Sequence, residues 1–322
     1  MSGKKVVITG GAGFIGANLT DSLINNGYKV AVYDNLSMGK LENISHLSSH
    51  PDFQFINGNV KDVNTLRHAC RDADKIVHLA AFKIPRYGNS YETLVTNNIG
   101  MKNVLDIAAE NKTKVVFAST SDVYGKNTTL PFSEESDCIY GPTTVRRWSY
   151  AVSKLFDEHL CFAYQENYEL PMSIIRIFGS YGPKQNLSWW GGPQSVFIDL
   201  ILKGMPVEIH GDGLQTRTFT YVSDTVAGFL AAIESDQANG EIFNIGSSSE
   251  TTILDLARLI KRLIGTKGEL DYRLIPYSTF GNYEDVRRRV PDTSKAKRLL
   301  GFEAKVSLEE GLSRTIEWQR NL

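Results

Sequence analysis

A tyrosine and a lysine four residues apart are the first side chains in this chain whose types and spacing suggest acid–base chemistry. Tyr150 and Lys154 lie in a stretch with apolar residues at helical spacing, so we predict a helix, capped by Ser149, with both side chains on one face. A nearby ammonium group favours the phenolate and lowers a tyrosine pKa from its usual value of about 10. Since Tyr-x-x-x-Lys is a weak pattern alone, the prediction of a general base depends on a cofactor site beside it.

The start of the chain predicts that cofactor site. A β-branched run, Lys5–Thr9, indicates a buried strand, and three glycines (Gly10, Gly13 and Gly16) come next, before a helical pattern begins. Glycines in such a turn let backbone N–H groups and a helix N-terminus approach a pyrophosphate. The alternative, a tight strand–helix connection without a ligand, is weakened by the acid that ends the second strand.

The second strand and its successors define the fold class. Lys29–Tyr33 ends in Asp34, whose carboxylate accepts hydrogen bonds from an adenosine ribose and repels a 2′-phosphate, which favours NAD over NADP. Further strands are predicted at residues 53–56, 75–79, 115–118 and 173–178. Strands that alternate with helices predict an α/β fold: a Rossmann-type doubly wound parallel sheet with ligands at the carboxyl ends of its strands. We interpret His78, at the end of one strand, as a core histidine.

The second part of the chain is less regular and predicts a smaller domain. Short strands at residues 207–210, 218–221 and 242–245 alternate with helices near 196–203, 224–234, 253–264 and 308–319. We expect a NAD-binding Rossmann domain at residues 1–180 that carries the Tyr/Lys pair. Residues 181–322 would mainly form an irregular α/β substrate-binding domain, with a soft boundary and some exchange of strands or helices.

Composition restricts the ligand and the compartment. The 322 residues include 35 lysines and arginines against 36 aspartates and glutamates, so no overall field points to nucleic acid or a membrane surface. A small-molecule ligand fits better. The three cysteines (Cys70, Cys138 and Cys161) are widely spaced, and no Cys/His cluster has metal-ligand spacing. With no signal peptide or run of about 20 apolar residues, we predict a cytoplasmic protein without a metal.

These motifs together resemble the extended short-chain dehydrogenase/reductase superfamily, the NAD-dependent nucleotide-sugar epimerases, dehydratases and decarboxylases. The resemblance covers nearly the whole chain. It extends beyond the glycine turn to Thr120 ahead of Val123-Tyr124-Gly125, Tyr181-Gly182-Pro183, the run from Gly211 to Asp224, and Pro291 to Ala296. It implies NAD as cofactor, a UDP-sugar as substrate, and a homodimer formed through the Tyr150 helix and a helix at Tyr91 to Glu110. The cofactor contacts that it implies are Gly10, Gly13, Phe14, Ile15, Gly16, Asp34, Asn35, Asn59, Val60, Leu79, Ala80, Ala81, Asn97, Tyr150 and Lys154.

The same resemblance assigns the catalytic roles. Tyr150 would remove the proton of the sugar 4-hydroxyl while carbon 4 gives up hydride, Lys154 would hold the nicotinamide ribose, and Thr120 would hydrogen-bond the same sugar oxygen.

Other residues are implied to bind the substrate. Arg217 resembles the arginine that clamps the diphosphate, and an arginine among Arg287, Arg288 and Arg289 would assist it. At least two of that triplet fit equally well as solvated surface cations. Ser121 and Gly179 are also predicted substrate contacts; Gly179 stands where the family usually has asparagine, and Asn59 where it usually has aspartate.

One residue separates the possible reactions. Asp122 precedes Val-Tyr-Gly, where plain 4-epimerases usually carry a small residue and the dehydratases and decarboxylases a glutamate. Ser121 lacks the carboxylic acid that protonates a leaving 6-hydroxyl, so 4,6-dehydration is disfavoured. Arg147-Trp148 and the tract from Gly281 to Pro291 are similar to the decarboxylase branch.

Three reactions therefore remain after oxidation of carbon 4. The sequence favours a 4-oxidase/5,6-reductase that acts on a 5,6-unsaturated UDP-hexosamine, in which Asp122 protonates carbon 5. The alternatives are a UDP-glucuronate decarboxylase and a 4-epimerase of UDP-glucose, UDP-GlcNAc or UDP-glucuronate, in which Asp122 is a spectator. A non-catalytic NAD sensor is disfavoured by the intact Thr120, Tyr150 and Lys154. The Trp189-Trp190 loop either shapes the sugar pocket or buries its rings.

Overall fold

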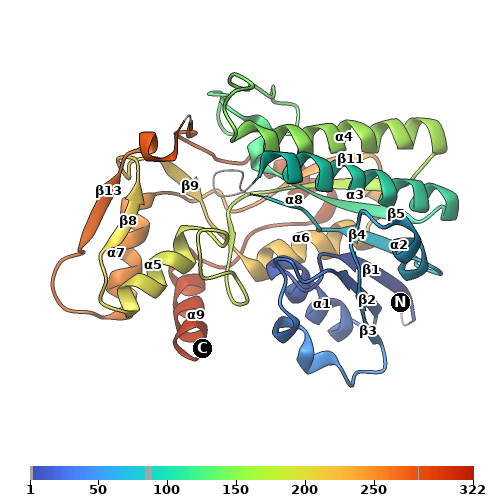
Figure 1. The fold of residues 1–322 in the computed structure, drawn as a ribbon, viewed down its shortest axis with the longest axis horizontal. Coiled ribbons are helices and arrows are strands. Elements are labelled where there is room, and N and C mark those ends of the chain that lie inside the picture. The colour runs from blue at the N-terminus through green and yellow to red at the C-terminus, as the bar shows by residue number, and fades with distance from the viewer. Residues whose placement is uncertain (1–2, 84–88, 282) are drawn as a thin grey trace.

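The larger of two lobes is built on a seven-stranded parallel sheet (Figure 1). The computed structural model describes residues 3–83, 89–281 and 283–322. Its sheet has the order β11-β6-β5-β4-β1-β2-β3, which confirms the predicted Rossmann-type doubly wound fold. The strands are β1 (Lys5–Thr9), β2 (Lys29–Asp34), β3 (Phe53–Asn57), β4 (Lys75–His78), β5 (Lys114–Thr120), β6 (Met172–Ile177) and β11 (Glu241–Ile245).

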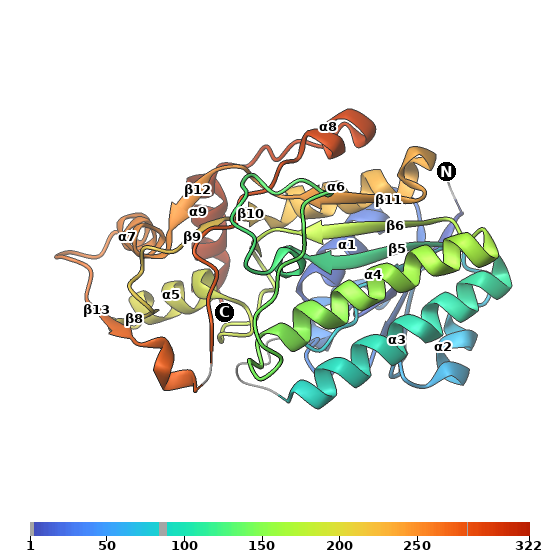
Figure 2. The same cartoon turned by 90° about the horizontal axis from the view of Figure 1, so that it is seen from above.

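Helices cover both faces of this sheet because its strands are apolar on both sides. On β1, Val6 and Ile8 belong to one buried cluster and Val7 to another. The first cluster lies under α1 (Phe14–Asn25), α6 (Val222–Glu234) and α8 (Ser294–Leu300). The second lies under α2 (Val63–Ala69), α3 (Ser90–Asn111) and α4 (Trp148–Tyr168), and Figure 2 shows α3 and α4 side by side.

The smaller lobe combines three helices with short strand pairs. Its helices are α5 (Pro193–Leu202), α7 (Ile253–Ile264) and α9 (Leu308–Arg320). Its strands are β8 (Val207–His210) with β13 (Tyr272–Ile275), and β9 (Thr216–Thr218) with β12 (Glu250–Thr252). A third pair, β7 (Ser180–Tyr181) with β10 (Thr220–Tyr221), lies where the chain leaves the sheet. The short 3-10 helices are η1 (Leu41–Asn43), η2 (Ser45–Leu47), η3 (Ser121–Tyr124), η4 (Asp236–Ala238) and η5 (Tyr277–Phe280).

The chain passes between the lobes more than once. The strand at residues 242–245, assigned from sequence to the smaller domain, is β11 at the edge of the main sheet, paired with β6. Its side chains Phe243, Asn244 and Ile245 are fully buried, which explains the difference. Because α6 and α8 also pack on the larger lobe, the part of the chain after residue 180 completes that lobe as well as forming the smaller one.

A buried polar network fixes α4 against the sheet. Arg176 on β6 forms an ion pair with Glu158 of α4 at 2.7 Å and donates to the Tyr124 hydroxyl at 2.9 Å. That hydroxyl donates to Asn244 Oδ1 on β11 at 2.7 Å. Removing one partner of such a buried pair costs about 3–5 kcal/mol. The network thus sets the position of the helix that carries Tyr150.

The helix α4 begins two residues earlier than predicted. Trp148 is its first residue, and the Ser149 hydroxyl donates to the Arg146 carbonyl at 2.7 Å instead of accepting a hydrogen bond from the first turn. The prediction that Ser149 caps the helix is therefore wrong. The shared face of Tyr150 and Lys154 does not depend on it, because both residues lie inside the helix. None of the helices in the described ranges is long and apolar enough to cross a membrane.

Candidate active site

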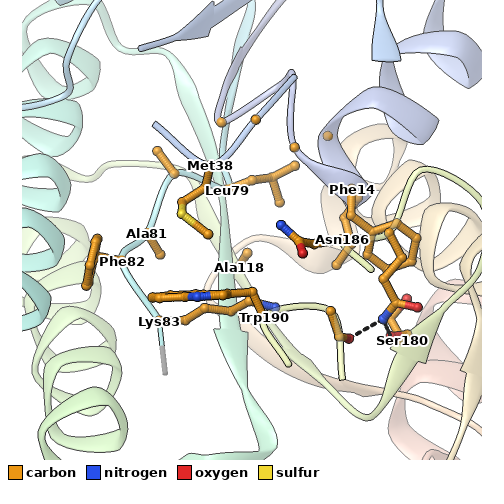
Figure 3. A pocket seen from close by; sticks show the side chains of 18 of the residues that line it. Phe14, Met38, Leu79, Ala81, Phe82, Lys83, Ala118, Ser180, Asn186 and Trp190 are labelled. Carbon is orange, nitrogen blue, oxygen red and sulfur yellow. Dashed lines mark hydrogen bonds between the residues drawn. The ribbon is translucent and has the colours of Figure 1, made fainter. Parts of the chain in front are cut away.

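A cavity of about 1060 Å³ opens at the carboxyl ends of the central strands (Figure 3). Its wall includes the glycine turn, Asp34 at the end of β2, and the segments that follow β3, β4 and β5. The predicted cofactor contacts in this wall are Gly10, Gly13, Phe14, Ile15, Gly16, Asp34, Asn35, Asn59, Val60, Leu79, Ala80, Ala81, Tyr150 and Lys154. The fold therefore brings these predicted contacts, from separate segments of the chain, together in the wall of one cavity.

Asn97 of α3 lies outside this wall. It is only 1% exposed, and its side chain accepts a hydrogen bond from the Phe82 backbone N–H at 2.7 Å and donates to Ser153 Oγ at 2.9 Å. These contacts tie the segment after β4 to α4. The structure thus gives Asn97 a part in positioning Phe82, which does line the cavity.

The glycine turn and Asp34 fit a dinucleotide. Gly10 has a φ of +73°, and a Cβ atom there would lie 2.7 Å from the Ala80 nitrogen, so a side chain would close the turn against the segment after β4. Phe14, Ile15 and Gly16, the first turn of α1 with its free N–H groups, line the same cavity. Asp34 accepts hydrogen bonds from the N–H groups of Ala12 at 3.0 Å and Leu36 at 2.8 Å, which fixes its carboxylate in the wall. The site therefore has the parts that hold a pyrophosphate and a ribose.

The Tyr/Lys pair and Thr120 meet in the wall of this cavity. Lys154 is 2% exposed, donates to the Ala118 carbonyl at 2.9 Å, and lies 4.5 Å from the Phe117 ring centre. Thr120 ends β5 and hydrogen-bonds Tyr150. The arrangement is that of a general base with a hydrogen-bond donor beside it.

The pKa of Tyr150 shifts in the direction opposite to the sequence prediction. Burial and the negative charge of Asp122 raise the pKa of Tyr150, and the hydrogen bond from Thr120 only partly opposes that rise. The expected lowering by Lys154 is not seen in this structure, since the ammonium group is directed to the Ala118 carbonyl. Burial in turn lowers the pKa of Lys154.

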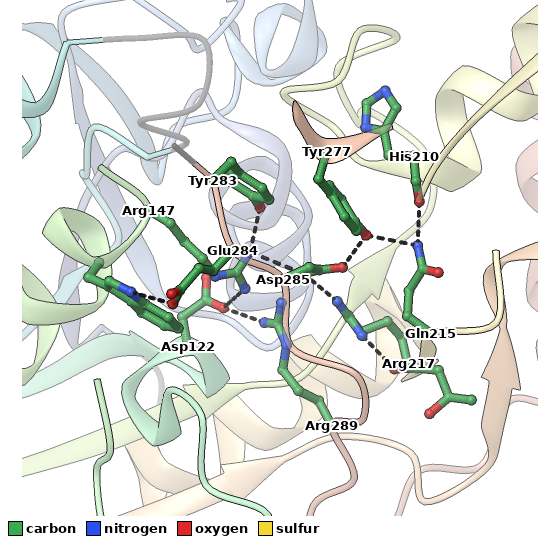
Figure 4. Close-up of polar contacts among 12 residues, drawn as sticks. Asp122, Arg147, His210, Gln215, Arg217, Tyr277, Tyr283, Glu284, Asp285 and Arg289 are labelled. Atoms are coloured by element: carbon green, nitrogen blue, oxygen red, sulfur yellow. Dashed lines mark hydrogen bonds and ion pairs between the residues drawn. The ribbon is translucent and has the colours of Figure 1, made fainter. Parts of the chain in front are cut away.

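Asp122, Arg147 and Arg289 line the same cavity as Tyr150. They belong to a cluster of arginines and aspartates whose contacts are shown in Figure 4. Asp122 Oδ1 pairs with Arg147 Nη2 at 3.2 Å and also with Arg289. Asp285 Oδ1 pairs with Arg147 Nη1 at 3.2 Å and with Arg217 Nη2 at 2.9 Å. We call these five residues the arginine cluster. Three guanidinium groups face two carboxylates, so the arginine cluster has one net positive charge.

The arginine cluster keeps Asp122 ionised. Burial alone would raise the pKa of Asp122, but the charges of Arg289, Arg147 and Arg217 outweigh it and lower that pKa. The Nε atoms of Arg147 and Arg289 are buried and have no hydrogen-bond partner among the described residues. An ionised carboxylate cannot donate a proton, whereas a cluster with net positive charge suits an anionic ligand.

The three consecutive arginines, Arg287, Arg288 and Arg289, lie in different environments. Arg289 is 16% exposed and lines the cavity, whereas Arg287 and Arg288 are 61% and 57% exposed. Arg287 pairs with Asp212 and Arg288 with Glu250, and neither contributes to the cavity wall. The predicted substrate contacts of Arg287 and Arg288 therefore have no support in the geometry, and Arg289 occupies the place expected of them.

A smaller cavity of about 270 Å³ adjoins the first within the smaller lobe. Arg217, Phe219, His210 and Trp189 line it, and Ser121, Gly179 and Arg289 line both cavities. Gly179 has a φ of +52°, and a Cβ atom there would collide with the Thr218 carbonyl oxygen. The asparagine usual at this position in the family does not fit this backbone.

The Trp189-Trp190 loop both buries rings and shapes the cavity. The Trp189 ring stacks on His210 at 4.0 Å between ring centres, and Trp190 packs edge-on against Phe82 at 5.6 Å. Both tryptophans line the large cavity. His78 is the core histidine that was predicted: it is 1% exposed, and its Nδ1 lies 2.7 Å from Thr9 Oγ1.

Several residues of the arginine cluster were not predicted as site residues. Arg147 and the tract from Gly281 to Pro291 were noted for their similarity to decarboxylases, without a role for Arg147 or Asp285 (Asn282 of that tract lies outside the described residues). Tyr277 donates to Asp285, and the Tyr283 hydroxyl accepts from Arg147. No local pattern marks these residues, because Arg147 and Asp285 are 138 positions apart in the chain.

A parallel sheet with a glycine turn, an acid at the end of its second strand and a Tyr/Lys pair in the same cavity defines a nicotinamide-dependent enzyme of the short-chain dehydrogenase type. Comparisons with known proteins narrow this class. Residues 7–315 match the family model described as GDP-mannose 4,6 dehydratase. The chain therefore belongs to the extended short-chain dehydrogenase/reductase family of NAD-dependent enzymes that modify nucleotide sugars, as its motifs predict.

Individual relatives extend over the whole chain. It is 38% identical to the UDP-N-acetyl-alpha-D-glucosaminuronate decarboxylase of Bacillus cytotoxicus, over 99% of this chain and 98% of that protein. It is also 38% identical to UDP-glucuronic acid decarboxylase 1 of Xenopus tropicalis, over 98% of this chain and 72% of that protein. A crystal structure of UDP-glucuronic acid 4-epimerase from Bacillus cereus, in complex with UDP-glucuronic acid and NAD, is similar with a TM-score of 0.88 and 31% identity, over 98% and 99% of the two chains.

Proposed function

We propose that this enzyme decarboxylates a UDP-hexuronic acid after NAD-dependent oxidation of the sugar at carbon 4. The observation that carries the proposal is the arginine cluster, whose net positive charge lies in and beside the cavity wall that also contains Tyr150. A carboxylate on carbon 5 of the sugar is the anion that such a cluster would hold near the reacting carbon. The decarboxylases found among the relatives support the same reaction.

The residues of the cavity wall have separate roles in the oxidation and reduction of carbon 4. When bound, NAD⁺ supplies a reversible hydride acceptor for that carbon. The Tyr150 phenolate accepts the proton of the 4-hydroxyl and returns it when the 4-ketone is reduced, while Thr120 holds the same oxygen. Lys154, on the same face of α4, would hold the nicotinamide ribose against this wall.

Once carbon 4 is a ketone, the carboxylate on carbon 5 is β to it, so the intermediate is a β-keto acid and can lose CO₂. The bond between carbon 5 and the carboxyl carbon breaks, CO₂ leaves, and its electron pair forms an enolate over carbons 4 and 5. Carbon 5 then takes one proton from solvent. After carbon 4 is reduced again, one UDP-hexuronate and one proton have become one UDP-pentose and CO₂.

The arginine cluster would hold the carboxylate for this step. Arg289 lines both cavities, so it lies where the sugar and the diphosphate of one substrate would join. Asp122 pairs with Arg147 and Arg289 and so fixes the two guanidinium groups in the wall. In the smaller cavity, Arg217 and the aromatic rings of Trp189 and Phe219 suit the diphosphate and uracil of a UDP-sugar.

The 5,6-unsaturated UDP-hexosamine that the sequence favoured is less well supported. That reaction needs an acid that protonates carbon 5, and Asp122 is held ionised by its arginine partners. It also places no anion on carbon 6 for the arginine cluster to bind. A UDP-glucuronate 4-epimerase remains the second candidate, because the likeness to the Bacillus cereus epimerase covers nearly the whole chain and its substrate carries the same carboxylate.

A homodimer is the quaternary structure that we propose. The helices α3 and α4 pack side by side and leave apolar side chains exposed on their outer faces. Among them, Ile99 is 43% and Phe156 is 51% exposed, and Tyr91 and Val152 are exposed as well. The three cysteines are free, and Cys70 and Cys161 are buried, which supports a cytoplasmic enzyme.

Incubation with separate UDP-sugars in deuterated water distinguishes the reactions. UDP-glucuronic acid, UDP-N-acetylglucosaminuronic acid, UDP-glucose and a 5,6-unsaturated UDP-hexosamine would be followed by NMR. Decarboxylation predicts CO₂ and a UDP-pentose with deuterium at carbon 5 from one of the two uronates. Inversion at carbon 4 without solvent label would establish the epimerase and refute the proposal, and a 6-deoxy product from the unsaturated sugar would establish the oxidase/reductase.

Replacing Tyr150 by Phe tests the general base itself. The variant keeps the ring, so it should bind NAD and fold as the wild type does, yet lose turnover by about 10²–10⁴-fold. Full activity in the Tyr150→Phe variant would remove Tyr150 from the mechanism.

A further inference from the structure

One buried carboxylate near the reacting centre has no partner that accounts for it. Asp157 lies on α4, seven residues after Tyr150 and three after Lys154, so the three side chains share one face of the helix. It is 0% exposed, and both of its carboxylate oxygens are buried without a hydrogen-bond partner among the described residues. A carboxylate in such a place is costly unless a nearby cation balances it or a proton neutralises it.

The neighbouring acid shows the contrast. Glu158 is equally buried, but it pairs with Arg176 at 2.7 Å and also accepts a hydrogen bond from Ser119. The cation that is left for Asp157 is Lys154, which is buried too and hydrogen-bonds the Ala118 carbonyl. Burial raises the pKa of Asp157 and lowers the pKa of Lys154, while each charge stabilises the other.

We infer that Asp157 is the internal counter-charge of Lys154, and that its gain or loss of a proton sets the pH range in which Tyr150 loses its own proton. Asp157 is thus a positioning residue that acts through the Tyr/Lys pair. The inference rests on the proposed roles of Tyr150 and Lys154 at carbon 4. It does not depend on which UDP-sugar is bound.

The direction of the effect follows from charge. An ionised Asp157 opposes the phenolate of Tyr150 and favours the ammonium of Lys154, so it raises the pKa of both groups. Other charges near the three residues are Asp122 from η3, which acts on Tyr150, and Glu158, which is neutralised by Arg176 from β6. Burial, together with the charge of Lys154, lowers the pKa of His78 on β4 to about 3, so His78 stays neutral.

The Asp157→Asn variant should therefore shift the whole pH profile toward acid. Its acidic limb reports Tyr150 and its basic limb reports Lys154, and both pKa values fall when the negative charge is removed. Unit charges about 10 Å apart, the rise of seven helical residues, shift a titration by roughly 1 pH unit at an effective dielectric constant of about 20. We expect the acidic limb of kcat/KM to move down by about that amount, and the basic limb to move down by more, because Lys154 is only three residues from Asp157.

The test has a second readout that needs no turnover. Calorimetry of NAD⁺ binding in buffers with different ionisation enthalpies gives the number of protons released at each pH. The pH of maximal release should fall by about 1 unit in Asp157→Asn. The Asp157→Leu variant packs differently but also lacks the charge, so its pH of maximal release should shift in the same direction. Glu166→Gln is the matched control, since it removes a charge from the same helix at a position farther from the Tyr/Lys pair.

Profiles of Asp157→Asn and Asp157→Leu that coincide with the wild type, or limbs that move in opposite directions, would overturn the inference. An active Tyr150→Phe variant would instead overturn the proposed function. The two failures are therefore distinguishable, because only the second removes Tyr150 from catalysis.

Discussion

Replacing Arg289 by Met tests whether the arginine cluster binds the sugar carboxylate. Arg289 is 16% exposed, lines both cavities and pairs with Asp122. Met keeps much of the volume and removes the charge, which leaves two guanidinium groups against two carboxylates. The net positive charge of the cluster, and with it the reason for an anion to bind there, would disappear.

The expected magnitude follows from the environment of Arg289. A hydrogen bond to a charged group contributes about 1.5–3 kcal/mol, and partial exposure places this one near the middle of that range. About 2 kcal/mol corresponds to roughly 30-fold in affinity. The assay compares binding of UDP-glucuronic acid and UDP-glucose by calorimetry in a Tyr150→Phe background, so that neither ligand turns over. The two sugars differ at carbon 6 alone, as carboxylate or hydroxymethyl.

Arg289→Met should weaken the binding of UDP-glucuronic acid about 30-fold and the binding of UDP-glucose far less. The adjacent residue supplies the control: Arg288 is 57% exposed, pairs with Glu250 at 2.8 Å and lies outside both cavities. Because Arg288 lies outside both cavities, Arg288→Met should leave both affinities nearly unchanged, and loss of its exposed ion pair should cost only about 0–1 kcal/mol of stability. Equal losses for the two sugars in Arg289→Met would refute carboxylate recognition and assign Arg289 to the shared diphosphate.

Three further predictions concern the cofactor turn, the cluster and the dimer. A Cβ atom at Gly16 would collide with the Gly10 carbonyl, so Gly16→Ala should weaken NAD binding at least tenfold, as measured by calorimetry. An unchanged affinity would contradict the role assigned to this turn. Burial would raise the pKa of Asp285, but Arg217 and Arg147 hold it far below its usual value, so Asp285→Asn should lose about 3 kcal/mol of unfolding free energy at pH 7. Because that stabilisation is present above the ordinary aspartate pKa and lost as pH falls, urea unfolding at pH 3 should show a smaller difference; an equal one would refute the ion-pair account. Phe156→Arg should convert a dimer to a monomer in light scattering, and a wild type that is already monomeric would exclude the dimer.

The doubly wound class of the sheet and the cofactor site could be predicted because their signals are local. The Gly10 turn, Asp34 at the end of its strand, and the spacing from Tyr150 to Lys154 each lie within a few residues, where chain geometry fixes which groups face one another. The strand at residues 242–245 was recognised as a strand but placed in the wrong lobe. Its partner is β6, and pairing between strands distant in sequence leaves no local pattern.

The arginine cluster was decided by the tertiary structure. Asp122 meets Arg147 across 25 residues of chain and Arg289 across 167, so no spacing rule links them. Nor could the sequence choose among three consecutive arginines, since the turn of the loop directs Arg289 inward and leaves Arg287 and Arg288 in solvent. Residue types therefore determined that the chain would hold a dinucleotide beside a tyrosine. Long-range packing determined which charges surround that tyrosine, because electrostatic interactions depend on distances in space and not on positions in the chain.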